Sequence, residues 1–165
     1  MDVVKMKIKK EFIAVMLLLW MFLIFLFSNQ NITNSMSLSD KVASKIIDVV
    51  VKVKKEEIPP QEKAKMVKNT RLMIRKTAHF TEYFILGILV FKIFEIYGVQ
   101  RALVYSIIFC FLYACSDELH QLFSDGRSAK VLDVLIDTSG SMLSIACFQF
   151  IKKRKLRIHM EKELN

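Results

Sequence analysis

The sequence contains little glycine, proline or cysteine. Its 165 residues include 4 Gly, 2 Pro and 3 Cys, and the spacing of Cys110, Cys115 and Cys147 fits neither a metal motif nor a disulfide framework. The sequence also lacks an internal repeat, a heptad array and an RNA-binding motif. The net charge of +9 therefore does not indicate a nucleic-acid partner, because basic residues that flank membrane spans and meet anionic lipid headgroups account for it.

The sequence is rich in apolar residues, which make up 53% of the chain and include 13 Phe and 9 Met. They gather in four runs, and a membrane-spanning helix needs about 20 such residues, with a range of roughly 17–25. The first run is short, but Lys9 and Lys10 at its end can extend toward the interface. This composition argues against a soluble domain and predicts a single domain over residues 1–165, an all-α integral membrane bundle of about four transmembrane helices. The predicted spans are Phe12–Phe27, Phe80–Tyr97, Ala102–Phe123 and Val131–Ile151.

Basic residues near the two ends of the chain predict its orientation in the membrane. Four lysines precede the first run and six Lys or Arg follow the last one, and such residues favour the cytoplasmic side. We therefore expect both termini in the cytoplasm, with the first run kept as an anchor because no Ala-x-Ala-like cleavage site follows it. Residues 28–78 would then lie outside although they carry eleven Lys or Arg and five acids; for a segment of this length the charge rule weakens.

The polar segment over residues 38–76 has a helical pattern. The stretch "LSDKVASKIIDVVVKVKKEE" offers an N-cap at Ser39 or Asp40, followed by apolar residues at helical spacing. Pro59 and Pro60 end this element, and "PQEKAKMVKNTRLMIRKT" predicts a second polar helix that starts near Pro60. We expect two amphipathic helices outside the membrane between the first and second spans.

Ionisable residues occur inside three of the predicted spans. One Asp, Lys or Arg at the centre of a spanning helix costs roughly 2.5–3.5 kcal/mol, so such residues indicate a function or a partner. Because spans alternate in direction, the polar ends of these three lie at one membrane face, which is the outer face if the termini are cytoplasmic. Asp117 and Asp137 each lie six residues from the nearer end of their runs, which is about 9 Å of helix. The ionisable residues are His79 at the start of the second span and Glu82 within it, Asp117, Glu118 and His120 in the third, next to the polar Gln121, and Asp133 and Asp137 in the fourth.

The helical phase of these residues predicts one shared pocket. At about 100° per residue, the polar residues of each span fall on one face, except Glu118, which lies about 100° from Asp117. Gly140, Ser141 and Ser144 lie on the acidic face of the fourth span, where small residues let another helix approach. We expect the three faces to turn inward, with Glu118 at the wall or against a neighbouring helix.

Basic residues border the expected pocket. Arg75 and Lys76 precede the second span, and Arg127 lies in the loop "SDGRSAK", where Asp-Gly predicts a turn. A buried carboxylate needs a cation or several donors, and arginine can bind one through two parallel hydrogen bonds. Lys76 and Arg127 therefore join the candidate binding residues.

Two stretches, "RKTAHFTEYFILG" and "YACSDELHQLFSDGRSAKVLDVLIDTSG", resemble the VanZ-like family of small bacterial membrane proteins. The resemblance rests on the basic-His-Phe-x-Glu-Tyr stretch, the Asp-Glu-x-x-Gln stretch, a following Arg and the spaced acids before a Gly, over about Arg75–Ser144. It implies a multi-pass protein of the bacterial cell membrane. The named member of the family is associated with low-level resistance to the glycopeptide teicoplanin, and the family often has Asn where this chain has Asp137.

Four interpretations of the polar residues stay open. They can form a structural network without chemistry, or a pocket that binds, or also modifies, a lipid headgroup, a cell-wall precursor or a glycopeptide, with His79 or His120 as base. Alternatively, two pairs spaced i, i+3, His79 with Glu82 and Asp117 with His120, can ligate a metal, with Asp133 and Asp137 as further ligands. A small proton-coupled transporter is the fourth, although no inverted repeat supports it. We expect no cofactor and no nucleic acid, and the lipid bilayer as partner; the catalytic residues, the ligand and the oligomeric state do not follow from the sequence.

Overall fold

The protein is described here by a computed structural model that covers residues 2–28, 32–54, 58–122 and 130–164. Within these ranges the chain forms helices and no strand. The helices are α1 (Asp2–Ser28), α2 (Ile32–Lys54), α3 (Pro60–Ile96), α4 (Ala102–Leu122) and α5 (Val131–Leu164).

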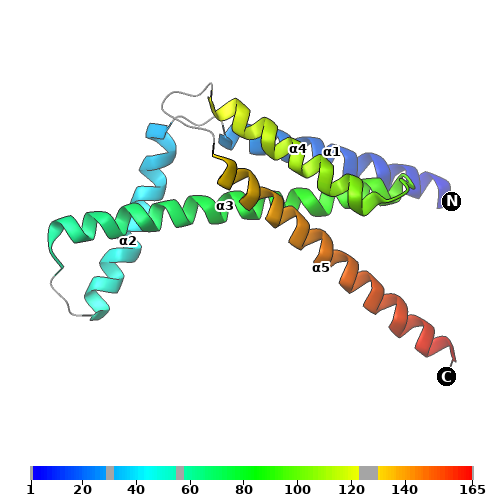
Figure 1. Cartoon of the computed structure of the whole chain (residues 1–165). Coiled ribbons are helices and arrows are strands. Elements are labelled where there is room, and N and C mark those ends of the chain that lie inside the picture. Colours follow the sequence, from blue (N-terminus) through cyan, green and yellow to red (C-terminus); the bar gives the residue numbers. More distant parts are fainter. Residues whose placement is uncertain (1, 29–31, 55–57, 123–129, 165) are drawn as a thin grey trace.

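Helix α3 is the element on which the others are assembled, since it contacts every one of them. Figure 1 shows α2 crossing its N-terminal half, while α1, α4 and α5 gather at its C-terminal half. The 37 residues of α3 span about 55 Å at 1.5 Å per residue, whereas the hydrocarbon core of a bilayer is about 30 Å thick. The apolar C-terminal half of α3 thus has the length of a span, and the polar N-terminal half extends beyond it.

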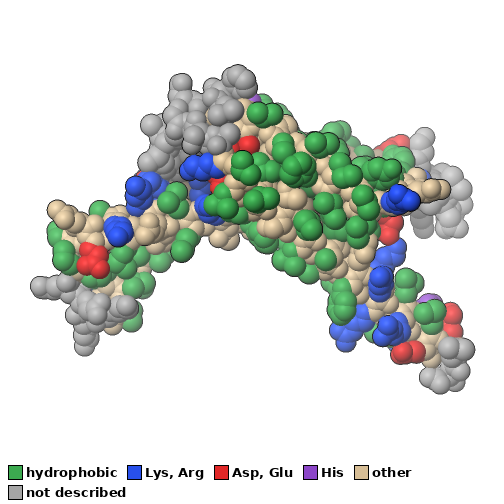
Figure 2. Space-filling model, viewed as in Figure 1, with side chains coloured by type: hydrophobic (Ala, Val, Ile, Leu, Met, Phe, Trp, Pro, Cys, Tyr) green, Lys and Arg blue, Asp and Glu red, His purple; other side chains and the backbone are tan. Residues whose placement is uncertain are grey.

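Four helical segments are long and apolar enough to cross a membrane: Lys10–Ser28, Pro60–Ile96, Ala102–Gln121 and Val131–Glu163. Their outer surface is hydrophobic, and Figure 2 shows such side chains over the centre of the molecule, with Lys and Arg over the arm of α2 and α3 and over the C-terminal part of α5. A surface of this kind is unusual for a monomer in water and suits contact with lipid. The prediction of an all-α membrane bundle with four spans is confirmed.

Two predicted helix boundaries were wrong, and a third helix continues beyond its predicted span. The second polar helix and the second span form one continuous helix, because neither Gly nor Pro separates Pro60 from Gly87. Helix α2 begins at Ile32, so that Ser39 and Asp40 lie inside it and cap nothing. Helix α5 continues past residue 151 to Leu164, because the basic segment that follows is rich in good helix formers.

The backbones of α3 and α5 touch where small residues face each other. A Cβ atom on Gly140 would lie 2.5 Å from the carbonyl oxygen of Phe80, and a Cβ atom on Gly87 would lie 2.8 Å from the Cα atom of Ser141. The Ser141 hydroxyl also donates a hydrogen bond to the carbonyl oxygen of Tyr83 at 3.1 Å. The close approach predicted for this face of α5 is confirmed, and it sets the N-terminal part of α5 against the middle of α3.

Helix α1 is attached to the bundle by two side chains that donate to main-chain oxygens. The indole Nε1 of Trp20 donates to the carbonyl oxygen of Glu82 on α3 at 2.9 Å. The hydroxyl of Tyr113 on α4 donates to the carbonyl oxygen of Met21 at 2.7 Å. Both bonds lie in the part of α1 that faces the polar ends of the other spans.

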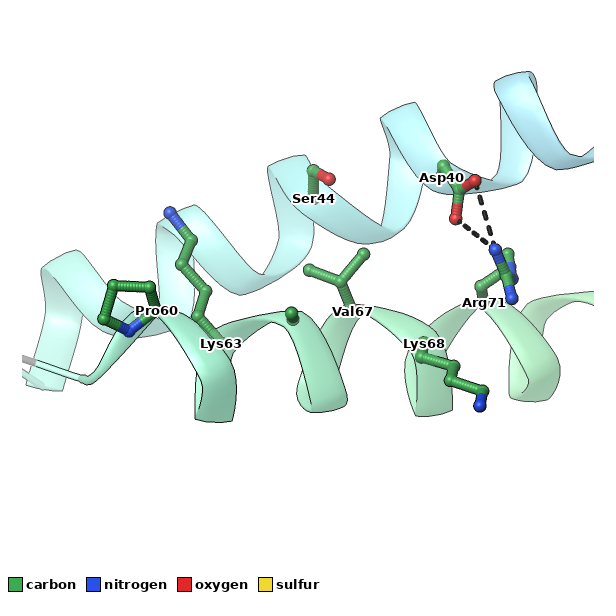
Figure 3. A pocket seen from close by; sticks show the side chains of 8 residues that line it. Asp40, Ser44, Pro60, Lys63, Val67, Lys68 and Arg71 are labelled. Carbon is green, nitrogen blue, oxygen red and sulfur yellow. Dashed lines mark hydrogen bonds and ion pairs between the residues drawn. The ribbon is translucent and has the colours of Figure 1, made fainter.

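The arm of α2 and α3 is held by ion pairs. Arg71 Nη1 lies 3.0 and 3.2 Å from the two carboxylate oxygens of Asp40, and Lys63 Nζ lies 2.7 Å from Asp48 Oδ1. Figure 3 shows the cavity between the two helices, of about 480 Å³, with Arg71 and Asp40 at one end and Pro60 at the other. None of the predicted site residues lines this cavity.

Candidate functional site

Three side chains from three helices meet inside the bundle. His79 on α3, Asp117 on α4 and Asp137 on α5 each place a potential ligand atom within 4.8 Å of the others. Asp117 and Asp137 are 5% and 1% exposed. The convergence predicted from helical phase is therefore confirmed, whereas a binding role for these residues stays a prediction. We use the name polar cluster for these residues together with Glu82, Glu118, Gln121 and Asp133.

Gln121 connects a cation to the buried carboxylate of Asp117. Its Nε2 donates to Asp117 Oδ2 at 3.2 Å, and its Oε1 accepts a hydrogen bond from Arg75 Nη2 at 3.3 Å. Since Gln121 is only 3% exposed, its amide has a fixed environment. The side-chain amide of Gln121 therefore bridges Arg75 and Asp117.

Two further contacts join α5 to its neighbours at the edge of the polar cluster. Lys76 Nζ lies 3.7 Å from Asp133 Oδ1. Glu118 Oε2 accepts a hydrogen bond of 2.7 Å from the backbone N–H of Lys130, which precedes the first residue of α5. Glu118 thus binds the start of a neighbouring helix, one of the two positions expected for it. Arg127 lies outside the described residues.

A cavity of about 380 Å³ lies between α1 and α4 and has Asp117 of the polar cluster among its lining residues. His120 stacks on Phe25 there, with ring centroids 4.5 Å apart. Asp117 lines this cavity and also belongs to the three-helix group with His79 and Asp137. The cavity is lined by Phe25, Tyr113, Ser116, Asp117, Leu119 and His120.

The structure brings together part of the metal-ligand set expected from the sequence. His120 faces Phe25 on α1, and Glu82 lies 3.7 Å from Nδ1 of His79 but outside the group whose ligand atoms converge. Asp137 from α5, which the sequence offered as a further ligand, joins His79 and Asp117 among the described residues. Helical spacing pairs residues within one helix, whereas the observed group takes one residue from each of three; metal binding by these residues stays a prediction.

Among the described residues, the inner part of the polar cluster holds more acids than cations. Asp117 and Asp137 are both buried there and belong to one group of converging ligand atoms. Within the described chain, Asp137 Oδ1 and the hydroxyl of Tyr83 are buried and have no hydrogen-bond partner. Isolated buried charges are costly, so this arrangement favours a bound group that brings positive charge or hydrogen-bond donors.

Sequence patterns did not single out the contribution of α1. Trp20 and Phe25 lie in the first apolar run and look like ordinary lipid-facing residues, yet one supports Glu82 and the other covers His120. The chain has a single Trp, but it lies near the middle of its span, so its position gave no signal of this role. Tyr83 lies beside Glu82 and is fully buried, and its place on the polar face of α3 follows from the helical period.

Comparisons with known proteins agree with this architecture. No curated protein and no solved structure matches the chain. The family model described as VanZ/LLP1 matches residues 13–152, a range that contains the whole polar cluster and most of all four spans. The chain therefore belongs to the VanZ/LLP1 family.

Proposed function

We propose that this membrane protein binds the polar part of a cell-envelope amphiphile, such as a lipid headgroup or a lipid-linked cell-wall precursor, in the polar cluster. The ligand enters sideways from the bilayer through the cavity between α1 and α4. One observation carries this proposal: Asp117 lines the cavity and is also a member of the three-helix group.

The lining of the cavity suits an amphiphile. Phe25 and Leu119 offer apolar surface, while Ser116 and His120 offer polar atoms beside Asp117. An acyl or isoprenoid chain remains in the bilayer outside, and its headgroup reaches the carboxylates. This is the combination expected of a site that takes its ligand from the membrane and not from water.

The charges favour a headgroup with hydroxyl or ammonium donors. The two described cations near the cluster are engaged, Arg75 with Gln121 and Lys76 with Asp133. Asp137 Oδ1 is a buried acceptor that no donor among the described residues satisfies. Sugars and amino groups supply such donors, and both occur on envelope lipids and wall precursors.

We further propose that the site faces the outside of a bacterial cell and that both termini lie in the cytoplasm. The basic residues 152–157 of α5 are exposed and lie toward the opposite end of the helix from Asp133. Positive residues of this kind favour the cytoplasmic side, which leaves the polar cluster at the outer leaflet. A role in teicoplanin tolerance, implied by the resemblance, would use this same site.

A tolerance assay tests the proposal in cells. The gene is expressed in a glycopeptide-susceptible bacterium, and the teicoplanin concentration that stops growth is measured together with the amount of protein in the membrane. Asp117→Asn and Glu82→Gln should abolish any gain in tolerance at unchanged abundance. The matched control is Glu95→Gln, which removes an acid paired with Lys152 at the other end of α3. If the two cluster variants lose abundance instead, the acids form a structural network.

Binding can be measured directly through Trp20. Because it is the single Trp of the chain and contacts the backbone of Glu82, its fluorescence reports on the cluster. In nanodiscs, a lipid-linked disaccharide-peptide precursor should change the emission in a saturable manner, and Asp117→Asn should remove the response. Phosphatidylglycerol, which also carries headgroup hydroxyls, serves as the comparison for an ordinary lipid. The absence of a saturable response to either lipid would refute the proposal.

A further inference from the structure

The three-helix group has the composition of a metal site. It combines one imidazole and two carboxylates, and a buried oxygen of Asp137 has no hydrogen-bond partner in the described chain. Asp137 is 1% exposed, so water does not satisfy this oxygen from the surface. We propose that His79, Asp117 and Asp137 bind a divalent first-row transition-metal ion.

The geometry is close to that required for coordination. Zinc binds imidazole nitrogen and carboxylate oxygen at about 2.0–2.2 Å, so that two ligand atoms of one ion lie at most about 4.2 Å apart. The observed separations of up to 4.8 Å need only small side-chain rotations to reach that range. No movement of the helices is required, since α3 and α5 are already in backbone contact at Gly140.

The surroundings of the group support a cation. Asp117 and Asp137 bring two buried carboxyl groups to the three-helix group, and their oxygens are suitable ligands of a divalent ion. Gln121 orients Asp117 through the bond of 3.2 Å to its Oδ2, and partners of this kind commonly fix metal ligands. Glu82 Oε2, 3.7 Å from His79 Nδ1, adds negative charge beside the imidazole.

The donor set indicates the class of ion. Imidazole suits zinc, iron and copper, and carboxylate suits manganese as well, whereas magnesium and calcium prefer oxygen ligands throughout. Three protein ligands leave at least one coordination position open. Because Asp117 also lines the cavity between α1 and α4, that open position is reachable from the cavity. The metal site does not require the envelope ligand proposed above, and each can fail without the other.

Titration with cobalt tests the inference. The full-length protein is purified in detergent, freed of its affinity tag, stripped with a chelator and titrated with Co²⁺, with zinc as the competing ion. We expect visible absorption bands and quenching of Trp20 fluorescence that saturate at a single ion per chain, and displacement by Zn²⁺ but not by Mg²⁺. A chain that shows no saturable binding overturns the proposal.

Variants decide whether the ion is bound at this group. Asp137→Asn and His79→Gln should each lower cobalt affinity at least about 100-fold, and Gln121→Ala, which removes a supporting contact, about 10–100-fold. His159→Gln and Glu95→Gln are matched controls, since they remove a His and an acid outside the polar cluster, and both should bind cobalt normally. Unchanged binding by Asp137→Asn, or equal loss in the controls, would place the ion elsewhere.

Stability provides a second readout that does not depend on spectroscopy. Without metal, Asp137→Asn should be at least as stable as the unaltered protein, because it replaces a buried carboxyl group by a neutral amide of similar size. Zinc should raise the melting temperature of the unaltered protein, as any ligand of the folded state does, and should leave that of Asp137→Asn unchanged. An equal zinc-induced increase in both proteins would contradict the proposal.

Discussion

The carbonyl oxygen of Phe80 on α3 lies 2.5 Å from the place where a Cβ atom on Gly140 of α5 would stand. Only a residue without a side chain fits there. Asp137 lies about one turn before Gly140 and His79 lies next to Phe80, so this contact sets the distance between two members of the polar cluster.

Gly140→Ala should therefore separate the two helices. We expect a loss of about 1–3 kcal/mol, the usual range for overpacking a close contact, as a lower midpoint of unfolding in detergent. Cobalt and ligand binding should weaken as well, because the group of His79 and Asp137 is spread apart. Ser139→Ala changes the exposed neighbour and should have little effect. A Gly140→Ala protein as stable as the control would show that the helices are not in contact.

Trp20→Phe should loosen the attachment of α1. It removes the indole donor to the carbonyl oxygen of Glu82, a bond worth about 1 kcal/mol. Backbone amides in α1 and the neighbouring turn of α3 should exchange hydrogen faster, as measured by mass spectrometry in nanodiscs. Tyr105→Phe alters an exposed aromatic residue of α4 and should leave exchange unchanged. Equal exchange in both variants would argue against the contact.

Ser116→Phe should close the cavity between α1 and α4. The larger side chain occupies space beside Asp117 and His120, so teicoplanin tolerance and the response of Trp20 to the wall precursor should be lost. Cobalt binding should persist, because Ser116 is not part of the three-helix group. The same substitution at the exposed Ser139 of α5 is the control. Normal tolerance in Ser116→Phe would exclude entry by this route.

Arg71→Ala should weaken the docking of α2 on α3. The pair of Arg71 and Asp40 is partly exposed, so we expect only about 0.2–1 kcal/mol, decreasing as salt screens the charges. Faster hydrogen exchange of α2 amides at low salt would measure it. Lys68→Ala removes a neighbouring cation that lines the same cavity and serves as the control. A salt-independent effect would contradict an electrostatic origin.

Reporter insertions test the proposed orientation. A reporter active only outside the membrane should function after Gly126 and fail after Asn165, and a cytoplasmic reporter should show the reverse. The reason is the run of basic residues that follows Ile151. The opposite pattern would place the polar cluster on the cytoplasmic face, while its internal contacts would stay as described.

The sequence predicts those parts of the fold that depend on helical period and on hydrophobic length. Both are local properties, which is why the four spans and the shared level of Asp117 and Asp137 follow without coordinates. The small-residue face at Gly140 and Ser141 is likewise visible in the sequence. The structure shows that this face packs against α3, at Phe80 and Tyr83.

The rest depends on contacts between distant segments. Trp20 bonds to Glu82 across 62 positions and Tyr113 to Met21 across 92, and no local pattern encodes either one. Helical spacing alone did not distinguish the converging residues from His120 for the same reason, since His120 of α4 stacks on Phe25 of α1. The sequence predicted two helices where α3 is one. The composition changes from polar to apolar along α3, but no helix-breaking residue marks this change.

The unbroken course of α3 has a mechanical consequence. A helix resists bending over a few turns, and between Pro60 and Gly87 no loop or glycine absorbs a change of angle. A displacement of α3 at Arg71 should therefore tilt the same helix at His79, about two turns later. The N-terminal half of α3, which packs against α2, and the polar cluster near His79 therefore move together as one rigid helix. This helix pivots where it packs against α5.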